Sequence, residues 1–455
     1  MAERERLDPL IWKVAAVATL GSFLTQMDAT VVNVSLSSLS RQLDSPLATI
    51  QWVISGYLLA LTLTLPLSGW LVGRIGAKAL YLACFAAFTV CSALCGLAWS
   101  AESLIGFRIL QGMSGGLLAP MAQMMVVRAS GKHMARVIGY LAVPVLLAPV
   151  FGPVAAGAIL KVASWRWLFL ANLPVGIVAL ALAYRLLPDD RAEAAPQSLD
   201  WLGLSLLSPG LVLFLYGADH AVSGAGLVTL TAALALLAAF LYAARRAGDR
   251  ALIDVALFAQ PSFSAAAVTQ FLANGVLYAG QMLIPLFLIN VCGRSPSATG
   301  WLMMPLGLGM LCTYPWMGHL TLRFGIRRLA AGGAALSLAG TALLLYTASR
   351  PLQPAMLALA LIVRGVGHST VGIPSMSAAY ASVKRAALPM ATTSLNIVQR
   401  LGGPALTTAC ALFLQWRLNQ SPAAQAPLMP FAQAFALLCA LHALLLAASL
   451  RLPAR

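Results

Sequence analysis

Charged residues are scarce in this sequence, and acidic residues are the scarcest of them. Only 9% of the 455 residues are Asp, Glu, Lys or Arg, and 60% are hydrophobic, whereas roughly 25% of a soluble globular domain is charged. The apolar runs are about 20 residues long, the length of a helix that crosses a bilayer, and they lack the alternation of outer-membrane barrel strands. The sequence therefore predicts an all-α integral membrane protein.

Metal-ligand spacing and clustered catalytic groups are also missing. The seven cysteines all lie in apolar segments, without the pairing typical of a metal site or a disulfide-stapled domain. An enzyme would need a nucleophile, a base or metal ligands close together, and the spans offer one deep acid and scattered histidines. No loop is long enough for the signalling domain of a receptor. We therefore expect a transporter, not an enzyme, with no metal and no cofactor.

About fourteen apolar spans can be read along the chain. They cover approximately residues 11–38, 48–73, 79–99, 102–127, 135–159, 165–187, 199–217, 225–244, 262–291, 297–319, 328–348, 352–379, 386–413 and 429–450. The segment Gly69–Leu80 matches Gly318–Leu329, with Gly, Leu, Arg, Gly and a base at the same offsets. Because many secondary transporters are built from internal repeats, we expect six-helix bundles at 1–187 and 262–455. Residues 188–261 then form a linker, two extra transmembrane helices and an interfacial helix.

Basic residues are distributed unevenly over the predicted loops. The net charge is +16, and 20 of the 29 Lys and Arg residues fall in one set of loops and 6 in the other, while Arg108, Arg364 and Arg400 remain inside spans. This bias predicts that both termini are cytoplasmic, and it explains the charge without a nucleic-acid partner.

Asp28 is the only acid deep inside a span. An acid at the centre of a membrane helix costs roughly 2.5 to 3.5 kcal/mol, so it indicates a functional site. Burial favours a neutral carboxyl group and a nearby cation favours the carboxylate, so a conformational change can load and release a proton. Arg108 lies at a depth compatible with contact. We expect these two residues to couple transport to protons, with a permanent structural ion pair as the alternative.

Short motifs are spread over nearly the whole chain. They are Asp28 with Thr30–Val34; Gly69, Leu71, Arg74, Gly76 and Lys78; Arg108, Gln111 and Gly112; Gly152, Pro153 and Gly157; Trp165–Gly176; Arg364, Gly365 and Gly367; and Asn396, Gly402 and Gly403. Together they resemble the signatures of the major facilitator superfamily, specifically its fourteen-span drug:proton antiporter branch. The chain departs from that pattern at Gly73, where an Asp is usual, and at Ala148 and Ala156, where glycines are usual.

The resemblance and the local chemistry suggest two further groups of site residues. Helix-bending, close-packing and basic-turn residues are expected to gate the transporter: Gly69, Arg74, Gly76, Gly152, Pro153, Gly157 and Arg323. Aromatic and polar residues are expected to line a substrate cavity: Asn33, Trp52, Tyr57, Gln111, Gln123, Asn274, Tyr278, Gln281, Arg364, His368, Asn396 and Arg400. Arg364 and Arg400 have no acid in any second-half span. Either polar neighbours and helix carbonyls satisfy them, or they leave an electropositive cavity.

The resemblance implies a major-facilitator fold and a proton-coupled multidrug exporter of the bacterial inner membrane, working by alternating access. Such a protein contributes to antibiotic resistance, uses the proton as its coupling ion and is expected to be a monomer in the lipid bilayer. The alternative is an exporter or symporter of a specific metabolite or lipid, of anionic or amphiphilic character.

Overall fold

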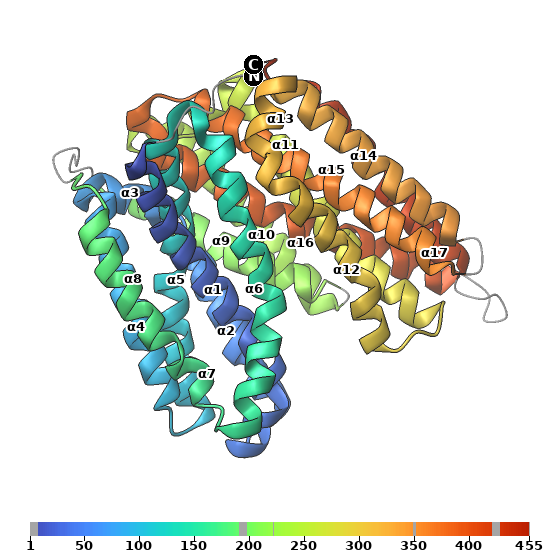
Figure 1. Ribbon diagram of the computed structural model, residues 1–455, viewed down its shortest axis with the longest axis horizontal. Helices are drawn as coiled ribbons and strands as arrows, with labels where there is room; N and C mark the ends of the chain where they lie inside the picture. Colours follow the sequence, from blue (N-terminus) through green and yellow to red (C-terminus); the bar gives the residue numbers. More distant parts are fainter. Residues whose placement is uncertain (1–7, 191–197, 222, 349–351, 421–427, 455) are drawn as a thin grey trace. The chain divides into compact units, whose positions relative to one another are not determined.

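The computed structural model describes residues 8–190, 198–221, 223–348, 352–420 and 428–454, apart from the side chains of residues 33, 34, 37, 132, 149, 150, 153, 249, 296 and 297. Within these ranges the chain forms helices and no strands, which confirms the predicted all-α class (Figure 1). The longer helices are α1 (Pro9–Gln42), α2 (Leu47–Thr64), α3 (Leu67–Ile75), α4 (Ala77–Gly96), α5 (Ala101–Ser130), α6 (Met134–Val162), α8 (Asn172–Leu186), α9 (Trp201–Asp219), α10 (Gly224–Ala247), α11 (Pro261–Asn290), α12 (Pro296–Thr313), α13 (Met317–Phe324), α14 (Ile326–Ala348), α15 (Pro354–Ala381), α16 (Leu388–Gln420) and α17 (Leu428–Ser449). The short ones are α7 (Trp167–Leu170), η1 (Gly131–His133), η3 (Gly248–Arg250), η4 (Val255–Ala259), η5 (Tyr314–Trp316) and η6 (Arg385–Ala387).

The chain divides into two compact units, each made of several segments. Unit 1 comprises Met1–Val212, Ala235–Val255 and Arg385–Ser394, and unit 2 comprises Leu213–Leu234, Ala256–Lys384 and Leu395–Arg455. In unit 1, α1 packs against α5, α6 and α8, and α5 also packs against α2 and α4. In unit 2, α15 packs against α11, α12 and α14. The domain limits at 187 and 261 stay a prediction.

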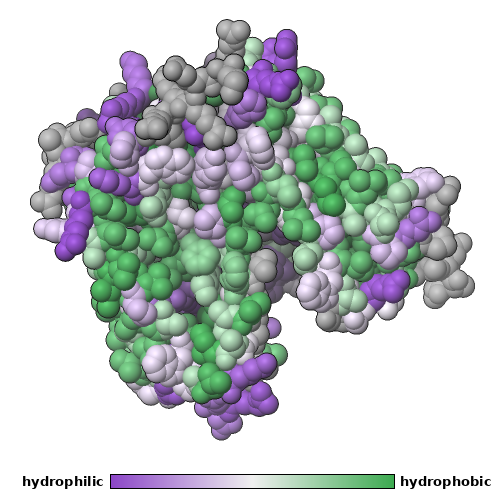
Figure 2. Space-filling model, in the orientation of Figure 1, coloured by the Kyte–Doolittle hydropathy of each residue, from purple (hydrophilic) through white to green (hydrophobic). Residues whose placement is uncertain are grey.

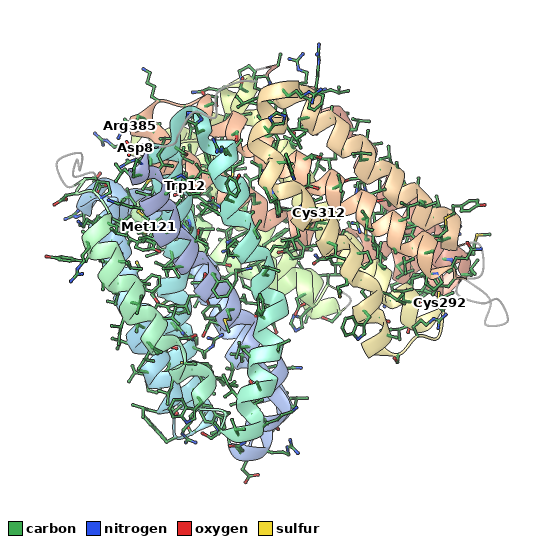
Figure 3. All side chains as sticks on the ribbon, in the orientation of Figure 1. Asp8, Trp12, Met121, Cys292, Cys312 and Arg385 are labelled. Carbon is green, nitrogen blue, oxygen red and sulfur yellow. The ribbon has the colours of Figure 1, made fainter. Side chains whose placement is uncertain are left out.

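The helices have the length and surface of membrane spans. Eleven of the described helices are long and apolar enough to cross a membrane, and α5, α6 and α12 coincide with the remaining predicted spans. Large apolar side chains of α4 and α8 point outward, including Val90, Ile177 and Tyr184, which are 58%, 61% and 70% exposed. In Figure 2, hydrophobic residues cover the middle of the visible face of unit 1 and hydrophilic residues lie at its ends. Such an apolar belt is what a bilayer requires.

The two repeat segments share one backbone conformation. Gly76 follows α3 with φ 83°, and Gly325 follows α13 with φ 77°, each seven residues after the first glycine of its repeat. Positive φ favours glycine, so the repeated glycine is needed where one helix ends and the next begins at once. Each repeat also follows a break at a proline, Pro66 before α3 and Pro315 before α13, so the predicted spans 48–73 and 297–319 are each interrupted.

The predicted interfacial helix at 251–260 differs from the structure. Residues 251–253 are bends and only Val255–Ala259 is helical, as the 3-10 helix η4. Leu252 and Ile253 are buried, at 2% and 4% exposed. The segment therefore turns its first apolar side chains into unit 1, which a continuous helix lying on the membrane surface would not do.

Candidate functional site

Asp28 and Arg108 meet in the interior of unit 1. Asp28 lies on α1 and Arg108 on α5, and their residues are 2% and 0% exposed. The Arg108 Nη1 atom donates to Asp28 Oδ2 at 2.5 Å, which is both a hydrogen bond and an ion pair. Each charge compensates the other where water is excluded.

Glycines on α5 bring Arg108 within reach of the α2 backbone. A Cβ atom on Gly112 would collide with the carbonyl oxygen of Tyr57, and one on Gly116 with that of Leu61. At this close approach, Arg108 Nε donates to the Val53 carbonyl oxygen at 3.1 Å, and the guanidinium carbon lies 4.1 Å from the centre of the Tyr57 ring. The small residues therefore place the cation against both a helix carbonyl and an aromatic face.

Two amide side chains complete the surroundings of the carboxylate. Asn172, at the start of α8, donates through Nδ2 to Asp28 Oδ1 at 2.8 Å and to Ser92 Oγ at 3.1 Å. Gln111 donates to the same Asp28 oxygen at 3.4 Å, and its own Oε1 accepts from Arg108 Nη1 at 2.8 Å. Sequence reasoning missed the roles of Asn172 and Ser92, although Asn172 belongs to the Trp165–Gly176 motif and is an amide in an apolar span.

Several donors converge on Asp28, and Arg108 has acceptors besides it. Asp28 accepts hydrogen bonds from one guanidinium and two amides. If Asp28 is protonated it loses the attraction to Arg108, but Arg108 keeps the Val53 carbonyl and Gln111 as acceptors. Arg108 Nη2 is buried and has no hydrogen-bond partner among the described residues. The described residues therefore satisfy the guanidinium incompletely.

The three predicted gating residues on α6 differ in their surroundings. A Cβ atom on Gly152 would collide with Thr30 Oγ1 on α1, so α6 and α1 are in close contact there. A Cβ atom on Gly157 would meet no described atom within 4 Å, and the Pro153 side chain lies outside the described part. The geometry therefore gives a close-packing reason for Gly152 but none for Gly157.

Gly69 packs against the first turns of α16, which belong to unit 1. A Cβ atom on Gly69 would lie 3.0 Å from Met390 Sδ and from Thr393 Oγ1. The neighbouring Ser68 hydroxyl is 2.7 Å from the same Thr393 oxygen. This contact joins the start of the first repeat to a segment more than 300 residues later. The gating role of Gly69 stays a prediction.

An acid that sequence reasoning missed caps the next helix of this region. The Asp190 carboxylate accepts from the backbone N–H groups of Ala77 and Lys78 at 2.8 and 3.2 Å, and pairs with Arg128 at 3.3 Å. It thus supplies negative charge at the N-terminus of α4, close to Gly73, where the family pattern carries its Asp.

The predicted gating arginines contact aromatic rings. The Arg74 guanidinium lies 5.4 Å from the Trp70 ring centre, and that of Arg323 lies 5.5 Å from the Phe324 ring centre. Both side chains are exposed. Their gating role stays a prediction.

The predicted cavity residues are divided between the two units. In unit 1, Tyr57 and Gln111 join the Asp28 site, Trp52 is 44% exposed and Gln123 is half-buried. The others lie in unit 2: Asn274, Tyr278 and Gln281 on α11, Arg364 and His368 on α15, and Asn396 and Arg400 on α16. Asn33 has its side chain outside the described part. That these residues line one substrate cavity stays a prediction.

Arg364 is the most deeply buried of the predicted cavity residues in unit 2. It is 2% exposed, and its Nη2 atom donates to the Val276 carbonyl oxygen at 2.5 Å. Gly280 leaves the space that the guanidinium occupies, since a Cβ atom there would overlap it. Arg364 Nη1 has no hydrogen-bond partner among the described residues. A helix carbonyl therefore satisfies this cation in part.

No cluster of three or more His, Cys, Asp or Glu side chains in the described ranges could hold a metal ion.

Comparisons with known proteins agree on one family. The model of the Major Facilitator Superfamily matches residues 18–407. The chain is 32% identical to the multidrug resistance protein B homolog of Mycobacterium tuberculosis over 429 residues, which covers 92% of this chain and 78% of that one. It is 30% identical to the putative multidrug resistance protein MdtD of Salmonella paratyphi B over 370 residues, 79% and 76% of the two chains.

Solved structures share the fold at low identity. The human organic anion transporter MFSD10 aligns with a TM-score of 0.64 at 16% identity, over 96% of this chain and 100% of that chain. The proton:xylose symporter XylE aligns with a TM-score of 0.62 at 13% identity, over 94% of both chains.

Proposed function

Because this chain belongs to the Major Facilitator Superfamily, we propose that it is a proton-coupled exporter of the multidrug type, an antiporter that works by alternating access. It is a multi-pass membrane transporter, and relatives at 32% and 30% identity are named multidrug resistance proteins. The proposal extends to the bacterial inner membrane, cytoplasmic termini and a monomeric state. The excess of basic residues in one set of loops supports the cytoplasmic placement of both termini.

The buried Asp28–Arg108 pair is the observation that carries the proposal. A proton that reaches Asp28 from outside neutralises it and releases Arg108, whose remaining acceptors are the Val53 carbonyl and Gln111. Deprotonation towards the cytoplasm restores the pair. A substrate that is favoured when Asp28 is ionised, or that displaces Arg108, then competes with the proton for one site, and this competition is what antiport requires.

The test uses inside-out membrane vesicles that contain the full chain. A respiratory substrate acidifies the lumen, and ethidium serves as a cationic fluorescent probe. We expect uptake driven by the pH gradient with the native chain, and its loss with Asp28→Asn, which keeps the shape of the side chain but cannot release a proton. Unchanged gradient-driven uptake by Asp28→Asn would contradict proton coupling at this site.

A second candidate substrate class follows from Arg364. This guanidinium is buried in unit 2 with one nitrogen unpartnered among the described residues, which favours an anionic or amphiphilic substrate. Fluorescein as an anionic probe in the same vesicles separates the two classes. Uptake of fluorescein but not ethidium would replace the multidrug proposal with export of a specific anion.

A further inference from the structure

Two adjoining cavities lie at the basic end of unit 1, away from the Asp28 site. One of about 200 Å³ is bounded by Trp70, Arg250, Leu252 and Met390, and one of about 470 Å³ by Trp201, Arg246 and Arg250. Both are also lined by Ser198 and Asp200. The larger volume is within the roughly 300 to 1,000 Å³ of small-ligand pockets.

The cavities present cationic groups that the protein leaves available. The Arg250 guanidinium lines both cavities and makes no hydrogen bond or ion pair within the described ranges. The Arg246 guanidinium lies 4.4 Å from the centre of the Tyr242 ring, so its edge stays free to donate. A planar guanidinium donates two parallel hydrogen bonds to phosphate oxygens, so two such groups suit a phosphate ligand.

The one described acid in the cavities is already engaged. Asp200 Oδ1 accepts from the Gly203 backbone N–H at 2.7 Å, and Oδ2 accepts from that of Leu252 at 3.1 Å. The carboxylate therefore stabilises the start of α9 and fixes the chain after η3. It makes no ion pair with Arg250, although both line the same cavities.

An apolar surface continues from the arginines along the inserted helices. Trp201 and Leu202 at the start of α9 are 73% and 61% exposed, and Leu241 and Tyr242 on α10 are 49% and 57% exposed. Exposed tryptophan and tyrosine beside arginine are typical of the boundary between lipid headgroups and acyl chains. A soluble anion would use the cations alone, whereas a lipid would use both the cations and the apolar surface.

We propose that Arg246 and Arg250 bind the phosphate headgroup of an anionic phospholipid, with its acyl chains beside α9 and α10. Basic pockets at the cytoplasmic ends of membrane helices suit such headgroups. Met390 lines the smaller cavity and also packs against Gly69, so the bound lipid lies next to the contact between α3 and the first turns of α16. This site is independent of proton coupling and of the exported substrate.

The test is native mass spectrometry of the full chain in micelles that contain equal amounts of phosphatidylglycerol and phosphatidylcholine with identical acyl chains. We expect preferential retention of phosphatidylglycerol by the native chain. The preference should fall about five-fold for each arginine removed in Arg246→Gln/Arg250→Gln. Arg250→Lys, which keeps the charge, should retain most of it.

The matched control is Arg185→Gln/Arg245→Gln, which removes the same charge from exposed arginines that line neither cavity. An equal fall in this control, or no fall in Arg246→Gln/Arg250→Gln, would overturn the site. In a last experiment, excess inorganic phosphate is added to the native chain in the same mixed micelles. If it displaces phosphatidylglycerol, the site takes a soluble anion and the lipid assignment is wrong; persistence of the preference supports it.

Discussion

Asn172 donates a hydrogen bond to Asp28 across 144 residues of sequence, at 2.8 Å, and the same amide nitrogen bonds Ser92. Three helices, α1, α4 and α8, therefore meet at one side of the carboxylate, while α5 supplies Arg108 and Gln111 to it. The candidate proton site is a buried network and not an isolated ion pair. Such a network responds to the loss of any member.

Asn172→Ala tests this network. The change removes a hydrogen bond to a charged group, which contributes about 1.5 to 3 kcal/mol, so we expect lower thermal stability and several-fold slower proton-driven transport. Unfolding in detergent and vesicle uptake measure the two effects. The control is Gln270→Ala in unit 2, whose buried amide donates to the Gly372 carbonyl oxygen. Equal transport losses in both variants would argue against a specific role for Asn172.

Arg108→Lys separates charge from geometry. Arg108 donates to Asp28, Gln111 and the Val53 carbonyl oxygen at the same time. The compact ammonium group of lysine cannot reproduce this planar arrangement of donors. The guanidinium bonds to two uncharged acceptors are lost, and because their donor is charged each contributes about 1.5 to 3 kcal/mol. We therefore expect clear destabilisation and a large loss of gradient-driven uptake. The exposed Arg41→Lys is the control. Native transport by Arg108→Lys would mean that positive charge alone suffices.

Gly112→Ala tests the close approach of α5 to α2. The added methyl group would meet the Tyr57 backbone, and helix backbone cannot move as a flexible side chain can. We expect about 1 to 3 kcal/mol of destabilisation from overpacking, measured by unfolding in detergent. Gly106→Ala on the same helix is the matched control, because its Cβ atom would meet no described atom within 4 Å. It should be neutral or slightly stabilising, since alanine favours helix.

The sequence predicted the features that depend on local pattern. Apolar length located the spans, and the repeat located Gly76 and Gly325, which share a positive φ. Asp28 and Arg108 could be predicted to pair because charged residues are rare inside the spans, and because the two residues lie at compatible depths in their predicted membrane helices.

The partners of these groups could not be predicted in the same way. Asn172 reaches Asp28, and Asp190 reaches the start of α4, through helix rotations that composition does not determine. Gly152 and Gly157 belong to one motif, yet among the described residues only the Cβ position of Gly152 meets another helix. Which glycine is needed for packing depends on the neighbouring helix and not on the motif.

Arg364→Met distinguishes a structural from a functional role for the enclosed arginine of unit 2. Arg364 donates to the Val276 carbonyl, but Nη1 lacks a partner in the described ranges. Replacing such a buried cation by an apolar side chain of similar length is often neutral or stabilising. We therefore expect an unfolding temperature at or above that of the native chain, together with loss of anionic-probe uptake if the anion is the substrate. Arg364→Ala, which leaves a cavity, should unfold earlier. If Arg364→Met also unfolds much earlier, the bond to Val276 outweighs the cost of the buried charge, and Arg364 stabilises the contact between α11 and α15.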